Sequence, residues 1–144
     1  MNFNNFTIKS QEAVQQAVNM VQSFGQQAIE PEHLLAGVLK VGENVTNFLF
    51  QKLGVNDRQI TTVLDKQIAS LPKVSGGEPY LSREANEVLQ KAVELSKELG
   101  DEYVSLEAII LAILQVKCTA STILKDAGVT EKELRAAINE LRQG

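Results

Sequence analysis

The stretch GQQAIEPEHLLAGVL, residues 25–39, has a counterpart in GDEYVSLEAIILAIL, residues 100–114. The two align without a gap, so that Gly25 falls on Gly100, and Glu32 on Glu107. A repeat at a fixed spacing indicates a fold built from two copies of one structural unit. The repeat is therefore the feature that decides the fold.

The composition fits one domain over residues 1–144 with a substantial core. Of the 144 residues, 44% are hydrophobic and 22% charged, and the formal net charge is −4. Lysine and arginine do not gather in a patch, which argues against nucleic-acid binding. The longest apolar run, residues 108–114, is too short to cross a bilayer, and the amino-terminal segment lacks the pattern of a signal peptide. We therefore expect no membrane association and a cytoplasmic protein.

The sequence offers no catalytic constellation. Cys118 and His33 are the only cysteine and histidine, too few for a zinc cluster, so both are interpreted as packing residues. The chain has no G-x-x-x-x-G-K-[ST] phosphate loop. Adjacent carboxylates such as Asp101 and Glu102 lack a partner that would mark an acid/base pair. We expect no enzyme activity, no cofactor and no metal in these 144 residues.

Each copy begins with two predicted helices. Apolar residues recur every three or four positions over residues 8–24, and the same pattern follows residue 82 in the second copy. Thr7 and Ser82 are suited to cap these helices, and glycines 25 and 100 to end them. The next helices, up to residues 39 and 114, are apolar on almost all sides, which predicts that they lie at the centre of the fold.

Two shorter helices complete each copy. One residue is inserted in the first copy, after which Gly54 aligns with Gly128 as a helix stop. Asn56 and Thr130 are the expected caps of the last helices, and Thr130 with Glu133 predicts a capping box.

The sequence thus predicts an all-α fold of eight helices, in two tandem four-helix repeats related by a pseudo-twofold axis. Repeat one covers about residues 6–70, and repeat two about residues 81–142. Between them, residues 71–80 (LPKVSGGEPY) contain two prolines and two glycines and predict a flexible connector.

These residues resemble a known family. Thr7, Ala17, Gly25, the segment IEPEHLLAGVL (29–39) and their second-copy partners resemble the Clp N-terminal (Clp repeat) domain of the Hsp100 chaperones. The segments MNFNNFT (1–7), LPKVSG (71–76) and ILKDAGVT (123–130) look most like its ClpB disaggregase branch, which acts in the stress response. The resemblance covers nearly the whole chain. It implies that the chain is an amino-terminal domain excised from a hexameric parent, whose ATPase modules use ATP and magnesium.

For this domain, the resemblance implies substrate docking. It would bind unfolded or aggregated polypeptide and deliver it to the ATPase ring formed by modules of the same chain. Such a task requires exposed apolar side chains in a groove. We expect that groove where two four-helix lobes meet. Leu89, Val93 and Leu106 are candidates for its walls, although the pattern favours the core for Leu89 and Val93. The isolated domain is expected to be monomeric.

The resemblance also points to four polar residues. Thr7, Asp101 and Glu107 stand where residues linked to substrate handling stand in ClpB-type domains, and Glu32 is the repeat counterpart of Glu107. Each also has a structural interpretation. Thr7 can be a helix cap and Asp101 a loop residue, while both glutamates suit the first turn of a helix, where negative charge is favoured.

Two alternatives remain at this point. In the ClpC or ClpA branch, the domain docks adaptors or phosphoarginine-tagged substrates for a Clp protease, and a pair formed by Glu32 and Glu107 would suit a guanidinium group. A free-standing helical scaffold without a chaperone function would explain the fold equally well.

Overall fold

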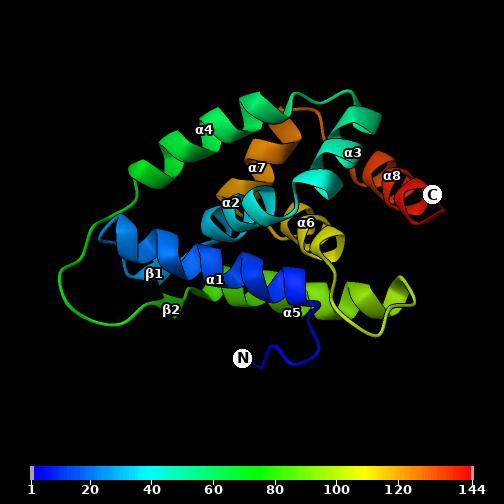
Figure 1. The fold of residues 1–144 in the computed structure, drawn as a ribbon. Coiled ribbons are helices and arrows are strands. Elements are labelled where there is room, and N and C mark those ends of the chain that lie inside the picture. The colour runs from blue at the N-terminus through cyan, green and yellow to red at the C-terminus, as the bar shows by residue number, and fades with distance from the viewer. Residues whose placement is uncertain (1, 144) are drawn as a thin grey trace.

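The computed structural model describes residues 2–143, which form eight helices and two very short strands (Figure 1). The helices are α1 (Ile8–Ser23), α2 (Pro31–Val41), α3 (Glu43–Leu53), α4 (Asp57–Ala69), α5 (Arg83–Glu98), α6 (Leu106–Gln115), α7 (Thr119–Asp126) and α8 (Glu131–Gln143). The strands are β1 (Ala28–Ile29) and β2 (Tyr80–Leu81). The predicted all-α fold of two four-helix repeats is confirmed, and the two short strands are an addition to it.

The predicted helix boundaries rest on the expected side chains. The side chains of five residues accept a bond from the backbone N–H three residues further on: Thr7, Asn56, Ser82, Ser105 and Thr130. Gly25 and Gly100 have φ values of 68° and 76°, the left-handed conformation that ends a helix. At α8 the predicted box differs in detail, because the Glu133 carboxylate accepts a bond from the Thr130 hydroxyl.

The segments that lead into the helices pair between the two repeats. β1 and β2 form a parallel pair in which Ile29 lies opposite Leu81, and an isolated parallel bridge joins Phe6 to Val104. The two pairings are equivalent under the repeat. In each, the segment before the first helix of one repeat is hydrogen-bonded to the segment before the second helix of the other. Backbone hydrogen bonds therefore tie the repeats together at two places.

The helices also interlock between repeats. The central helices α2 and α6 contact each other, α3 packs against α8, and α4 packs against α7 (Figure 1). The third helix of each repeat thus covers the fourth helix of the other. The expectation of two lobes that meet at a seam is wrong, because neither repeat is a separate body.

The core is mainly aliphatic and is centred on α2 and α6. In α6 all residues from Leu106 to Leu114 are buried except Glu107. Leu106 is 4% exposed, so the prediction that it lines a groove is wrong. Leu89 is 0% exposed and Val93 is partly buried against the core, which agrees with the core interpretation of both. Within residues 2–143 no single helix is long and apolar enough to span a membrane, although the bent α6–α7 pair passes that test by length and composition.

A buried polar network joins three segments of repeat one. His33 Nδ1 accepts a bond from the Glu30 N–H at 2.9 Å, so its Nε2 carries the proton and donates to Gln26 Oε1 at 2.8 Å. Gln26 Nε2 donates to the Ile68 carbonyl at 2.7 Å. Burial lowers the pKa of His33 to about 4. The network holds the α1–α2 loop against the end of α4 and requires a neutral imidazole.

The connector is more closely attached than its composition predicts. Its last residue, Tyr80, belongs to β2, and the Val74 N–H donates to the Gly25 carbonyl at 2.9 Å. Lys73 Nζ donates to the Phe24 carbonyl at 3.0 Å. Residues 72–78 are nevertheless exposed. Hydrogen exchange measured residue by residue would show how far they move independently.

Gly37 marks the closest approach between α1 and α2. A Cβ atom at this position would overlap the backbone carbonyl oxygen of Ala13. Its repeat counterpart in α6 is Ala112, which is fully buried, so the second repeat accommodates a methyl group at the same place. The α1–α2 contact therefore depends on glycine.

We predict that Gly37→Ala lowers the free energy of unfolding by about 1–3 kcal/mol, because overpacking outweighs the gain of about 1 kcal/mol in helix propensity. Urea unfolding followed by circular dichroism measures this. The control is Ala112→Gly, which should lower the free energy of unfolding by about 1 kcal/mol, because glycine forms helices less readily than alanine. A Gly37→Ala variant as stable as the parent would refute the close approach.

His33 predicts a pH dependence of stability. The unfolded chain gains a proton at this residue near pH 6.5, and the folded chain only near pH 4. Stability is therefore complete above pH 6.5 and falls, by up to about 3 kcal/mol, as the pH drops from 6.5 towards 4. The His33→Gln variant lacks this titration, so its stability should change less over that range. Equal slopes in the two proteins would contradict the assignment.

Candidate functional site

Three of the four predicted polar residues lie in one region. The Thr7 N–H donates to the Val104 carbonyl at 3.0 Å, and the Val104 N–H donates to the Asn5 carbonyl at 2.8 Å. These bonds fix the start of α1 against the loop between α5 and α6. Asp101 begins that loop, and Glu107 lies in the first turn of α6. The cross-repeat pairing thus brings Thr7 close to both acids.

Asp101 and Glu107 share one partner, Arg142, in the last turn of α8. The Arg142 guanidinium donates through Nη1 and Nη2 to the two Asp101 carboxylate oxygens, both at 2.7 Å. It also donates to Glu107 Oε2 from Nη2 at 3.2 Å and from Nε at 3.3 Å, and to Ser105 Oγ at 3.3 Å. Sequence reasoning missed Arg142. No local pattern links it to acids 41 and 35 residues away.

This cluster is partly shielded from water. The side chains of Asp101, Glu107 and Arg142 are 22%, 12% and 28% exposed. The hydrogen bonds that Arg142 donates to Asp101 raise the pKa of Arg142, burial partly opposes this effect, and the charge of Glu107 adds to it. A bidentate pair with a second acid holds its geometry better than a single surface pair. Both carboxylates are therefore engaged with Arg142.

Glu32 has a different environment, in repeat one. It is 4% exposed, and burial raises its pKa, while a bond from its own backbone N–H lowers it. It lies beside Gln67 of α4. The counterparts of Asp101 and Arg142 in repeat one are Gln26 and Ile68, both buried. The ion-pair cluster is therefore specific to repeat two, and Glu32 does not join it.

Exposed apolar side chains lie next to the cluster. Ile8, adjacent to Thr7, is 75% exposed, and Tyr103, adjacent to Val104, is 49% exposed. A shallow hollow of about 460 Å³ runs along α1 and is lined by Phe3, Ile8, Gln11, Glu12, Val14, Gln15 and Val18.

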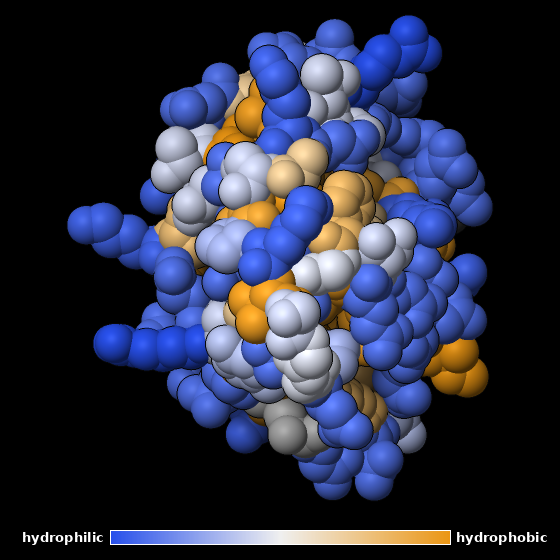
Figure 2. Space-filling model, turned by 90° about the vertical axis from the view of Figure 1, so that its left-hand side faces the viewer, coloured by the Kyte–Doolittle hydropathy of each residue, from blue (hydrophilic) through white to orange (hydrophobic). Residues whose placement is uncertain are grey.

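The equivalent positions of the other repeat show that this exposure is not a requirement of the fold. The counterpart of Ile8 is Arg83, and that of Tyr103 is Ala28. The fold therefore accepts a charged or a small residue at these positions. On the side of the molecule seen in Figure 2, the exposed hydrophobic residues form small areas that are separated by hydrophilic side chains.

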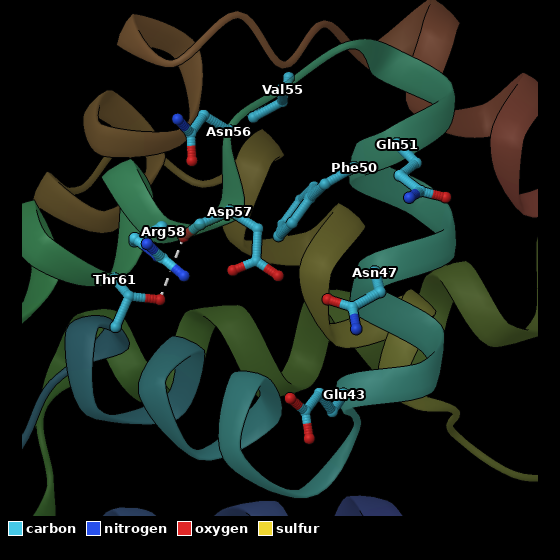
Figure 3. Close-up of a pocket in the computed structure, with 9 residues that line it drawn as sticks. All are labelled: Glu43, Asn47, Phe50, Gln51, Val55, Asn56, Asp57, Arg58 and Thr61. Carbon is cyan, nitrogen blue, oxygen red and sulfur yellow. Dashed lines mark hydrogen bonds between the residues drawn. The ribbon is translucent and has the colours of Figure 1, made fainter.

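A larger hollow, of about 720 Å³, lies between α3 and the start of α4 (Figure 3). Its lining residues are Glu43, Asn47, Phe50, Gln51, Val55, Asn56, Asp57, Arg58 and Thr61. The ring of Phe50 and the carboxylate of Asp57 point into the space between the helices. None of the predicted site residues lines this hollow. Within residues 2–143 no group of three or more His, Cys, Asp or Glu side chains is placed to hold a metal ion.

Comparison with known proteins identifies the family. Residues 5–127 match the family model described as the Clp repeat (R) N-terminal domain. The whole chain is 78% identical to the chaperone protein ClpB of Bacteroides thetaiotaomicron and 60% identical to that of Porphyromonas gingivalis. The chain spans 17% of the length of each of these relatives.

Solved structures show the same fold at low sequence identity. The Hsp104 N-terminal domain of Candida albicans has a TM-score of 0.84 at 21% identity, with 96% of this chain and 92% of that chain covered. The N-terminal domain of ClpD from Arabidopsis thaliana has a TM-score of 0.74 at 23% identity, covering 100% and 98%. A ClpV N-domain solved in complex with a VipB peptide has a TM-score of 0.75 at 20% identity, covering 92% and 83%.

The family match, the similarity to two ClpB chaperones and the shared fold agree with one another. The chain belongs to the Clp repeat N-terminal domain family of the Hsp100 chaperones.

Proposed function

We propose that this domain docks unfolded or aggregated polypeptide and passes it to ATPase modules of the same parent chain. The observation that carries the proposal is the exposure of Ile8, which lines the hollow along α1, and of Tyr103, which precedes the residue bonded to Thr7. Exposed apolar side chains around a concave surface suit segments that are normally buried in folded proteins. The ClpV N-domain is known in complex with a peptide, which supports peptide docking as a capacity of this fold.

Thr7, Asp101 and Glu107 hold the apolar residues of this surface in place. The apolar residues make the contacts with bound polypeptide. The Thr7 hydroxyl accepts the Ser10 N–H and donates to Ser10 Oγ at 2.8 Å, so its one proton is already used within the chain. It fixes the first turn of α1, from which Ile8 projects. Asp101 and Glu107 bind Arg142 and thereby hold the loop that carries Tyr103.

The wider assignment follows from the family. We propose that the parent is a hexameric, cytoplasmic ATPase that uses ATP and magnesium in protein disaggregation, and that this domain is monomeric alone. The adaptor or phosphoarginine alternative gains no support from the geometry. Glu32 is 4% exposed, and Glu107 already binds a guanidinium of the chain itself. A simple scaffold gives no reason for the exposure of Ile8.

We predict that Ile8→Ser weakens binding of a reduced, carboxymethylated unfolded protein by about 3–10-fold, because part of one isoleucine no longer leaves water on binding. NMR titration of the labelled domain measures the affinity and the shifted residues. Val63→Ser in α4 is the control, since Val63 is also exposed, at 45%. It should leave binding unchanged. Both variants should be as stable as the parent within about 0.5 kcal/mol.

The shifted signals test the site independently of the variants. We expect them at Ile8, Tyr103 and the hollow along α1. Shifts confined to α3 and α4 would refute the site, and no shift with any unfolded protein would refute the function.

Salt provides a second test of the apolar mode. Apolar contacts are weakly screened, so raising the salt concentration from 0.05 to 0.5 M should change the affinity by less than about threefold. A fall of about a hundredfold would show instead that charge pairs dominate binding.

A further inference from the structure

We propose that Arg142 sets the charge selectivity of the docking surface. By pairing with Asp101 and Glu107, it weakens the attraction of these acids for basic segments, so that apolar content is the main determinant of which segments bind. The inference rests on the proposed function and deepens it by naming the class of segment selected: apolar, without a preference for arginine or lysine.

The first argument is the geometry of the Arg142 guanidinium. Its three nitrogens together make five contacts with Asp101, Glu107 and Ser105. This is the fork-shaped arrangement that an arginine of a bound polypeptide would need in order to use the same carboxylates. An incoming arginine can reach them only by displacing Arg142.

That displacement is unfavourable because Arg142 belongs to the same chain. An attached group competes at an effective concentration on the order of millimolar or more, well above the concentration of a free substrate segment. Asp101 and Glu107 therefore stay occupied while polypeptide binds beside them. Both acids flank the loop that contains Tyr103, so their charge would otherwise act directly at the apolar surface.

The second argument is the comparison with repeat one. At the place of Arg142 that repeat has Ile68, which is 1% exposed, and at the place of Asp101 it has Gln26. The same helix packing is thus stable without any ion pair. The cluster lies only in the repeat that carries Tyr103, which connects it with the docking surface.

The test uses two disordered peptides of about twelve residues with the same leucine and phenylalanine positions. One contains only neutral polar residues between them, and the other has two of these replaced by arginine. Affinities are measured at low salt by NMR titration. The parent domain should bind both peptides equally within about twofold. Arg142→Gln should bind the arginine peptide about 5–10-fold more tightly than the neutral one, because two carboxylates are released.

Two further variants separate charge from structure. The triple variant D101N/E107Q/R142Q has no freed carboxylates, so the preference for arginine should disappear. The double variant D101N/E107Q leaves Arg142 unpaired and should bind the arginine peptide about threefold more weakly than the neutral one. If Arg142→Gln does not fold, the double variant still tests whether the charge of this cluster changes the affinity for the arginine peptide.

The outcomes distinguish the inference from the proposed function. An Arg142→Gln variant that is folded and binds both peptides equally overturns the inference. A parent domain that binds neither peptide overturns the docking function, while the ratio of affinities in Arg142→Gln still judges the inference. A purely structural Arg142 would lower both affinities together and leave their ratio unchanged.

Discussion

Helix α6 imposes the constraint on which the whole structure depends. From Leu106 to Leu114 only Glu107 is not buried, so this helix has to be covered on every side. Three other helices of one repeat cannot surround it. The cover is completed by α2, α1 and α3 of the other repeat, and α2 is covered in the same reciprocal way. Two copies interlock because neither can bury its central helix alone.

The two repeats have different polar interactions at equivalent positions. At equivalent corners, repeat one has the neutral network of Gln26, His33 and the Ile68 carbonyl, and repeat two has an ion-pair cluster at the surface. The first is buried and rigid, and it excludes charge. The second is partly exposed and lies beside apolar side chains that the fold does not require. The two repeats thus share one helix arrangement but differ at the surface. The proposed docking surface lies where they differ.

Local signals in the sequence predicted the local structure well. Thr7, Ser82 and Ser105 cap helices because a hydroxyl at that position reaches an N–H three residues on, which depends on neighbours in sequence alone. The pairing of Phe6 with Val104 and the contacts of Arg142 join residues far apart in the chain. They depend on how the repeats dock, which hydrophobic periodicity does not encode. The groove prediction for Leu106 is wrong for the same reason, since periodicity identifies the apolar face of a helix but not what covers that face.

The cross-repeat bridges have a consequence for synthesis of the chain. The partner of Phe6 is Val104 and that of Ile29 is Leu81, so the first repeat cannot complete its backbone pairing until residue 104 of the second repeat has left the ribosome. At about 5–20 residues per second, the 98 residues that separate Phe6 from Val104 take about 5–20 s to emerge. During that interval the apolar faces of α2 lack their cover. A domain proposed to hold unfolded chains for a chaperone is itself, for those seconds, a nascent chain with exposed core.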